Sequence, residues 1–254
     1  MARALQCCLA MDHSSVQSQQ QERKFLVDAD TADRFWMAVA PQLQPQHENS
    51  AHPCTYIRTT YFDTPDFSYY RSGTHAAAQR LRVREYASAA TLDEMPVLSD
   101  RCFLELKQSS GGLRHKRRLR IPAGDVTAHL ARLHDGKLQP CVTSWYRRNA
   151  LADAADRIRI TLDQGIAFCE PVTLGITGGN PQPSRVFARG PAFVLEVKLW
   201  DQQPDWLTAA LQGLYEARGF SKFIFGMRAA RRWLTNCHRR TDDVALRLAG
   251  VMAG

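Results

Sequence analysis

The sequence predicts an α+β protein built on a predominantly antiparallel β-sheet or barrel, with helices packed outside it. Strand-like segments outnumber helical ones, and turn signals separate most neighbours. Several segments also alternate charged with aliphatic residues, as in Arg80–Arg84, Leu104–Lys107, Arg157–Asp163 and Leu195–Leu199. Because successive side chains of a strand point to opposite faces, each of these segments has one aliphatic face and one charged face.

The first half of the chain is expected to begin with a disordered leader, because residues 1–20 are polar and rich in Gln and Ser. Asp30 and Thr31 can cap a helix whose apolar stripe includes Phe35 and Val39. The expected elements are strand 22–27, helix 30–40, strand 56–63, strand 80–86, strand 101–108 and strand 114–121.

The second half is expected to contain further strands and to end in helices. Residues 170–191 contain four Gly and four Pro, which predicts a long loop. The expected elements are helix 125–133, strands 142–148, 157–163 and 193–199, helix 204–219 and a basic helix from about residue 227. Together the elements predict one domain over residues 21–235 and a C-terminal helical tail over residues 236–254.

Length and composition bound the possible functions. The 254 residues are enough for a large β-rich domain, and 33 Lys and Arg against 25 Asp and Glu give a net charge of +8. This excess favours an acidic partner, although a merely basic protein is the simpler interpretation of charge alone. Seven cysteines without a CxxC pair argue against a zinc site or a full disulfide framework. Because no segment resembles a signal peptide or a membrane span, a cytoplasmic location is expected.

The charged faces of the strands have a common consequence. If the aliphatic faces pack outward against helices, about a dozen cations and several acids must line one interior. Unpaired charges are too costly to bury in a dry core, whereas a wet tunnel that holds a polyanion removes the difficulty. Its cations would bind phosphate oxygens, and its glutamates would hold a divalent metal. The alternative is a solvated sheet face with weak cross-strand pairs.

Eight short motifs follow one another along the chain, namely Glu22–Phe25, Tyr61–Thr64, Arg82–Arg84, Phe103–Lys107, Tyr146–Arg148, Arg159–Asp163, Leu195–Lys198 and Phe220–Phe223. In this order they resemble the VTC domain, the polyphosphate polymerase module of the vacuolar transporter chaperone complex and of bacterial stand-alone relatives. That domain is one of the CYTH-like triphosphate tunnel metalloenzymes. The resemblance covers roughly residues 22–233 and implies the triphosphate tunnel fold, an antiparallel tunnel barrel.

The resemblance also implies a reaction. A nucleoside triphosphate would bind in the tunnel and transfer its terminal phosphate to a growing inorganic polyphosphate chain, with Mn or Mg as the divalent metal. Transfer would be in line and would rely on positioning and charge neutralisation. The residues implied to act on the phosphates in catalysis are Arg82, Arg84, Lys107, Arg148, Arg159 and Lys222. The expected substrate-binding residues are Lys24, Arg80, Lys116, Arg118, Lys198 and Ser221. The expected metal ligands are Glu196, Glu105 and Glu22.

Two positions depart from the pattern of the relatives. The eukaryotic polymerases carry a further Lys just before the Phe-Ser-Lys motif, where this chain has Arg218 and Gly219. The hydrolase branch opens with Glu-x-Glu-x-Lys, where this chain has Gln20, Glu22 and Lys24. Three functions therefore stay open: a polyphosphate polymerase, a hydrolase of triphosphates or polyphosphate, and a polyphosphate-binding module without turnover. Nucleic acid is not expected as a partner, because the basic strands lack interleaved surface aromatics. The oligomeric state is left open.

Overall fold

The structure is a computed structural model that describes residues 21–73, 78–110, 113–133, 138–171 and 185–235. Its centre is a ten-stranded antiparallel sheet whose main path runs in the order β1, β10, β8, β7, β3, β4, β5, β6, while β2 pairs with β7 and β9 with β8. The strands are β1 (Gln21–Val27), β2 (Gln44–Pro45), β3 (Cys54–Asp63), β4 (Gln79–Ala89), β5 (Val97–Ser110), β6 (Leu113–Ile121), β7 (Gln139–Ala152), β8 (Ile158–Cys169), β9 (Val186–Arg189) and β10 (Phe193–Leu199). The helices are α2 (Ala29–Val39), α3 (Ser68–Arg71), α4 (Val126–Ala131), α5 (Asp205–Ala210) and a C-terminal helix over residues 222–235.

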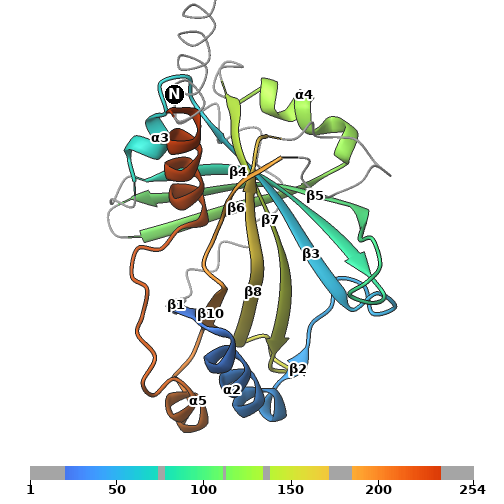
Figure 1. Ribbon diagram of the computed structural model, residues 1–254, viewed down its shortest axis with the longest axis vertical. Coiled ribbons are helices and arrows are strands. Elements are labelled where there is room, and N and C mark those ends of the chain that lie inside the picture. The colour runs from blue at the N-terminus through green and yellow to red at the C-terminus, as the bar shows by residue number, and fades with distance from the viewer. Residues whose placement is uncertain (1–20, 74–77, 111–112, 134–137, 172–184, 236–254) are drawn as a thin grey trace, which may run out of the picture.

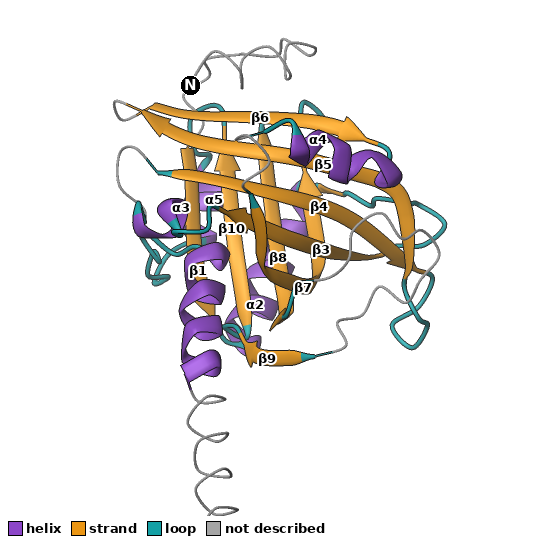
Figure 2. Cartoon of the chain, turned by 90° about the horizontal axis from the view of Figure 1, so that it is seen from above, coloured by secondary structure: helices purple, strands orange, loops and turns teal. Residues whose placement is uncertain are grey.

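The sheet is curved and unclosed, and its two ends cross each other in Figure 2. The edge strands β1 and β6 are not paired with each other within the described residues. Lys107 of β5 nevertheless lies within electrostatic reach of Glu22 on β1 and Glu196 on β10. The predicted antiparallel architecture, with helices outside and a C-terminal helix, is therefore confirmed, and the structure adds that the barrel is open between β1 and β6.

Part of the outer face is covered by α2 and α5, which lie together beside β1 and β10 (Figure 1). The α2 helix is capped by Asp28, whose side chain accepts a hydrogen bond from the backbone N–H of Thr31 at 2.8 Å. The cap is therefore Asp28 and not the predicted Asp30, which already lies in the first turn. Phe35 and Val39 of α2 pack on aliphatic residues of the strands. These are Leu151, Ile160, Leu162, Leu195, Val197 and Leu199.

The inner face is apolar at the end that the helix 222–235 covers (the red helix in Figure 1). Phe223 and Met227 of this helix belong to the same buried cluster as Tyr61 of β3 and Phe168 of β8. Gly226 allows the close approach, because a Cβ at this position would lie 2.7 Å from the Phe168 ring. The helix thus closes one end of the curved sheet. Its apolar contacts do not extend over the charged part of the inner face.

The C-terminal elements differ from the sequence prediction. The helix predicted over 204–219 ends at Ala210, and the following segment bonds to the edge of the sheet, where the Ala217 N–H donates to the Lys24 carbonyl at 2.7 Å. This main-chain pairing outweighs the helical periodicity of the sequence. The basic helix begins at residue 222 and not near 227, since Ser221 caps it. Strand β9 lies within the predicted loop 170–191.

Some predictions fall outside the described residues. The disordered leader over 1–20 and the helical tail over 236–254 lie there, as does Gln20, so the domain boundaries stay predictions. Within the described residues, no helix combines the length and the apolar composition that crossing a bilayer requires.

Candidate functional site

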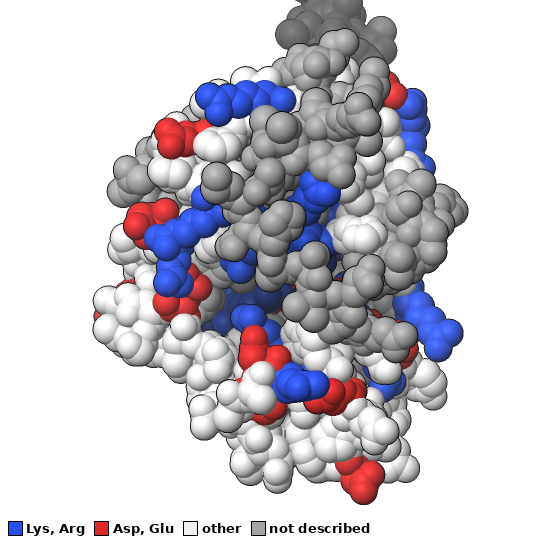
Figure 3. Space-filling model, turned by 180° about the vertical axis from the view of Figure 1, so that it is seen from behind, with Lys and Arg blue, Asp and Glu red and all other residues white. Residues whose placement is uncertain are grey.

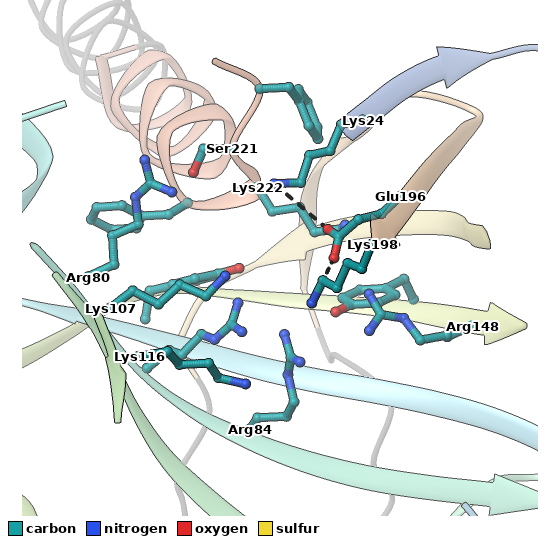
Figure 4. Close-up of a pocket in the computed structure, with 15 residues that line it drawn as sticks. Lys24, Arg80, Arg84, Lys107, Lys116, Arg148, Glu196, Lys198, Ser221 and Lys222 are labelled. Carbon is teal, nitrogen blue, oxygen red and sulfur yellow. Dashed lines mark ion pairs between the residues drawn. The ribbon is translucent and has the colours of Figure 1, made fainter. Parts of the chain in front are cut away.

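A cavity on the inner face of the sheet collects most of the predicted site residues (Figure 4). Nine of its lining residues are cations from several strands and the closing helix, namely Lys24, Arg80, Arg82, Arg84, Lys107, Lys116, Arg148, Lys198 and Lys222. The other lining residues are Tyr61, Tyr146, Glu196, Phe220, Ser221 and Phe223. The space-filling view shows Lys and Arg side chains gathered in a hollow near the middle of one face (Figure 3).

Strand register explains why these cations share a face. Residues directly opposite each other in neighbouring strands point the same way. Arg82 of β4 pairs with Tyr61 of β3 and with Glu105 of β5, and Glu105 pairs in turn with Arg118 of β6. The alternation that the sequence shows within each strand is thereby aligned across the sheet.

Glu105 is the counter-ion for one group of cations. Its side chain is fully buried, and it accepts a hydrogen bond from Arg82 Nε at 2.7 Å. Lys116 Nζ and Arg118 Nε lie 3.1 and 3.3 Å from its other carboxylate oxygen. Burial acts to raise the pKa of Glu105, but Arg82, Arg84 and the other cations hold that pKa well below its usual range. Glu105 is buried between these cations and does not line the cavity, which favours a counter-ion role over the predicted metal ligand.

Asp163 is the counter-ion for a second group. Arg148 donates to it in bidentate fashion, from Nε at 2.6 Å and from Nη2 at 2.8 Å, and Lys222 Nζ donates at 2.6 Å. Burial acts to raise the pKa of Asp163, yet Arg148 and Lys222 lower it. The ring of Tyr146 lies beneath both cations, 4.8 Å from Lys222 Nζ and 5.5 Å from the Arg148 guanidinium carbon.

Glu196 and Glu22 form a third group with two lysines of β1 and β10. Lys198 Nζ lies 3.1 Å and Lys24 Nζ 3.7 Å from Glu196, and Lys24 also contacts Glu22. Burial acts to raise the pKa of Glu196, but Lys198, then Lys24, outweigh it and hold that pKa well below the usual value. The pKa of Glu22 is lowered as well, because nearby lysines outweigh burial and the neighbouring Glu196.

The resemblance to the VTC domain implies a divalent metal, and Glu196 and Glu22 are the candidate ligands. Among the described residues, no three His, Cys, Asp or Glu side chains are grouped so that they could enclose a metal. Magnesium and similar hard cations are commonly held by one or two carboxylates together with substrate phosphates. Glu196 and Glu22 fit a metal of this shared kind, and they do not fit a metal held by protein ligands alone.

Lys107 differs from the other lining cations because it has no hydrogen bond or ion pair with another described residue. Burial, followed by repulsion from Arg82, lowers its pKa to about 7, although Glu22 and Glu196 act in the opposite direction. Arg84 Nε also lacks a hydrogen-bond partner in the described part of the chain and lies 3.9 Å from Glu105. Both side chains line the cavity, so Lys107 is available to an anion there.

Some predicted site residues lie apart from the cavity. Arg118 stacks 3.6 Å from the centre of the Phe103 ring and donates to Tyr86 Oη, and it does not line the cavity. Arg159 lies opposite Lys198 in the strand register but is also not a lining residue. Arg218, the residue near the lysine of the eukaryotic polymerases, is 88 % exposed and does not line the cavity either.

Sequence reasoning missed several contributors to the site. Tyr61, Phe220 and Phe223 line the cavity, and each belongs to one of the eight motifs. Asp163 ends the motif Arg159–Asp163, where its position in the alternation placed it on the charged face. The motifs and the strand alternation indicated where these residues lie. Nothing in the sequence showed that Asp163 joins the sheet to the closing helix.

The chain is similar to several solved structures and matches one family model. The chain is similar to the PH1819 protein from Pyrococcus horikoshii OT3, with 13 % identity, a TM-score of 0.49, and coverage of 81 % of this chain and 97 % of that chain. A provisionally named adenylate cyclase from Vibrio parahaemolyticus gives 14 % identity and a TM-score of 0.47, with the same coverage of 81 % and 97 %. None of the curated proteins matches the chain. The model of the VTC domain matches residues 19–136 and 125–231, and the chain therefore belongs to the VTC domain family.

Proposed function

We propose that this protein is a metal-dependent phosphotransferase that moves the terminal phosphate of a nucleoside triphosphate onto inorganic polyphosphate. The observation that supports this most strongly is the charge of one cavity. In the described part of the chain, seven of the lining cations share four carboxylates, Glu22, Glu105, Asp163 and Glu196, and Lys107 has no such partner. An excess of positive charge in a partly buried cavity is stabilised when a polyanion occupies it. We further propose that the protein works in the cytoplasm, where nucleoside triphosphates are available.

The lining cations would bind the phosphates in two ways, according to their side-chain type. Arg82, Arg84 and Arg148 would bind phosphate oxygens through guanidinium donors, and Lys107 and Lys222 would add point charges. Phosphoryl transfer depends mainly on positioning and on neutralising charge on the transferred group, and both can come from such cations. A divalent metal held by Glu196 and Glu22 would supply further charge neutralisation at the phosphates.

Transfer to a phosphate acceptor suits this cavity better than transfer to water. Water must lose a proton when it attacks, whereas the terminal phosphate of a polyphosphate chain is already an anion. Among the described lining residues there is no histidine, and Glu196 is the single carboxylate. Its pKa is held well below the usual value by its lysine partners, which makes it a weak base. Hydrolysis and binding without turnover remain the alternatives that an assay must separate.

The direct test is to incubate the purified protein with ATP and Mn²⁺ and to follow both long polyphosphate on a gel and the release of free phosphate. The proposal expects long chains. Free phosphate alone would identify a hydrolase, and tight triphosphate binding without either product would identify a binding module.

The variant Glu196→Gln keeps the shape of the side chain but weakens any metal ligation. We expect its turnover to fall by at least about a hundredfold, while metal-free tripolyphosphate binding persists. Unchanged turnover would remove Glu196 from the metal site. Glu170→Gln is a suitable control, because this exposed glutamate pairs weakly with Arg185 and does not line the cavity.

A further inference from the structure

Asp163 occupies an unusual place in the site, because its two partners come from structures of different kinds. Arg148 is its direct cross-strand neighbour, so the pairing of β7 with β8 fixes their relative position. Lys222 is instead the first residue of the helix 222–235, which belongs to no strand ladder. The Asp163 side chain is 1 % exposed, and all three donors lie within 2.8 Å of its oxygens. One carboxylate thus joins the closing helix to the wall of the cavity.

The donors that remain unused point to a consequence for binding. A guanidinium has five N–H groups, and Arg148 spends two of them on Asp163. An ammonium has three, and Lys222 spends one. Both residues also line the cavity, where Figure 4 shows them on the same side as Glu196. Asp163 therefore holds two long and otherwise flexible side chains while leaving most of their donors for a ligand.

We propose that Asp163 is a positioning residue that sets Arg148 and Lys222 as a fixed pair of phosphate-binding groups. It would act through these cations and would touch neither the substrate nor the metal. This inference rests on the proposed function in one respect, since it takes the cavity to bind a triphosphate or polyphosphate. It goes further because Asp163, which does not itself line the cavity, fixes the positions of Arg148 and Lys222.

For the variant without the Asp163 charge, the proposal predicts a change in anion affinity opposite to the one that total charge predicts. Removing a negative charge beside an anion-binding cavity should strengthen anion binding if only the total charge matters. If Asp163 positions its partners, its removal releases both side chains, and the anion must then order them at an entropic cost. Neutralising Asp163 should therefore weaken the binding of an anion even though the cavity becomes more positive.

The test is equilibrium binding of tripolyphosphate to the full chain by titration calorimetry, with a chelator present so that no metal takes part. We expect Asp163→Asn to bind about tenfold more weakly than the parent protein. Asp163→Glu keeps the charge but moves the carboxylate by one methylene, and we expect an intermediate affinity. If Asp163→Asn does not fold, the Asp163→Glu variant decides, because an affinity equal to that of the parent would overturn the proposal.

Glu85→Gln is the matched control. Glu85 forms an equally buried bidentate pair, with Arg58 Nε at 2.7 Å and Arg58 Nη2 at 2.9 Å, but on the outer face of the sheet. Its loss should lower stability and leave tripolyphosphate affinity unchanged. A double variant adds a second check, because Asp163→Asn should cost less affinity in a Lys222→Met background than in the parent.

Other outcomes would overturn the proposal. Equal or tighter metal-free binding by Asp163→Asn would show that Asp163 acts only as a charge. Normal metal-free binding together with a loss of Mn²⁺-dependent turnover would identify it as a metal ligand. A parent protein that does not bind tripolyphosphate at all would instead refute the proposed function, and this result would be visible before any variant is compared.

Discussion

The outer and inner faces of the sheet both bury arginine, and they neutralise it in different ways. On the outer face, Arg58 and Glu85 form a one-to-one bidentate pair in which both side chains are about 5 % exposed. On the inner face, the single carboxylate of Glu105 has four cations within 4 Å, namely Arg82, Arg84, Lys116 and Arg118. The charges of the outer pair balance, because one arginine faces one glutamate. Around Glu105, four positive charges face one negative charge. The difference fits the proposed function, in which an anion completes the inner group, whereas the outer pair needs no ligand.

The strongest test of this comparison removes the carboxylate from each face. Glu105→Gln and Glu85→Gln both leave buried arginine without its partner, and we expect each to lose about 3–5 kcal/mol of unfolding free energy in urea titrations. Tripolyphosphate should raise the Tm of Glu105→Gln by more than it raises the Tm of the parent, because the ligand supplies the missing negative charge.

The same ligand should raise the Tm of Glu85→Gln only as much as it raises that of the parent. Equal responses in the two variants would contradict the distinction between the faces. The pairing of β4, β5 and β6 fixes the backbone positions of the Glu105 partners even without the carboxylate. This separates Glu105 from Asp163, whose partner Lys222 comes from a helix outside that register.

Much of this comparison could be predicted from the sequence, because alternation within a strand identifies its charged face. The alternation in Arg80–Arg84 and Leu195–Leu199 placed Arg82, Arg84, Glu196 and Lys198 on that face, and strand register brought them to one cavity. Partners that depend on three-dimensional contacts could not be predicted. Lys222 meets Asp163 across 59 residues of sequence, and the helix containing Lys222 starts where Ser221 caps it, ahead of the basic run.

A second test asks whether the position of a cation matters more than its charge. Lys222→Met and Arg218→Met each remove one positive charge from the same short segment of the chain. Lys222 lines the cavity, whereas Arg218 is 88 % exposed and does not line it. We expect Lys222→Met to weaken tripolyphosphate binding about tenfold and Arg218→Met to leave it within about twofold of the parent. Equal losses would show that general attraction by a basic protein explains the binding.

The last test concerns pH and Lys107, an inner cation without an ion pair among the described residues. Burial lowers its pKa to about 7, so it is charged below neutral pH and loses its charge as the pH rises. An anion binds the charged form, and affinity is therefore expected to be highest below pH 7 and to fall above it. Lys116 should extend the fall, since burial lowers its pKa to about 8.

The measurement is metal-free tripolyphosphate affinity between about pH 6.5 and 8.5, and we expect the parent to lose roughly tenfold relative to Lys107→Arg across this range. The arginine variant is the reference because it stays charged, while the ligand's own protonation affects both proteins equally. Parallel pH profiles would mean that Lys107 does not contact the anion. A steeper fall in the parent would show that Lys107 meets the anion with a charge that no described carboxylate neutralises. Arg58 on the outer face has no such charge to offer, because Glu85 pairs with it.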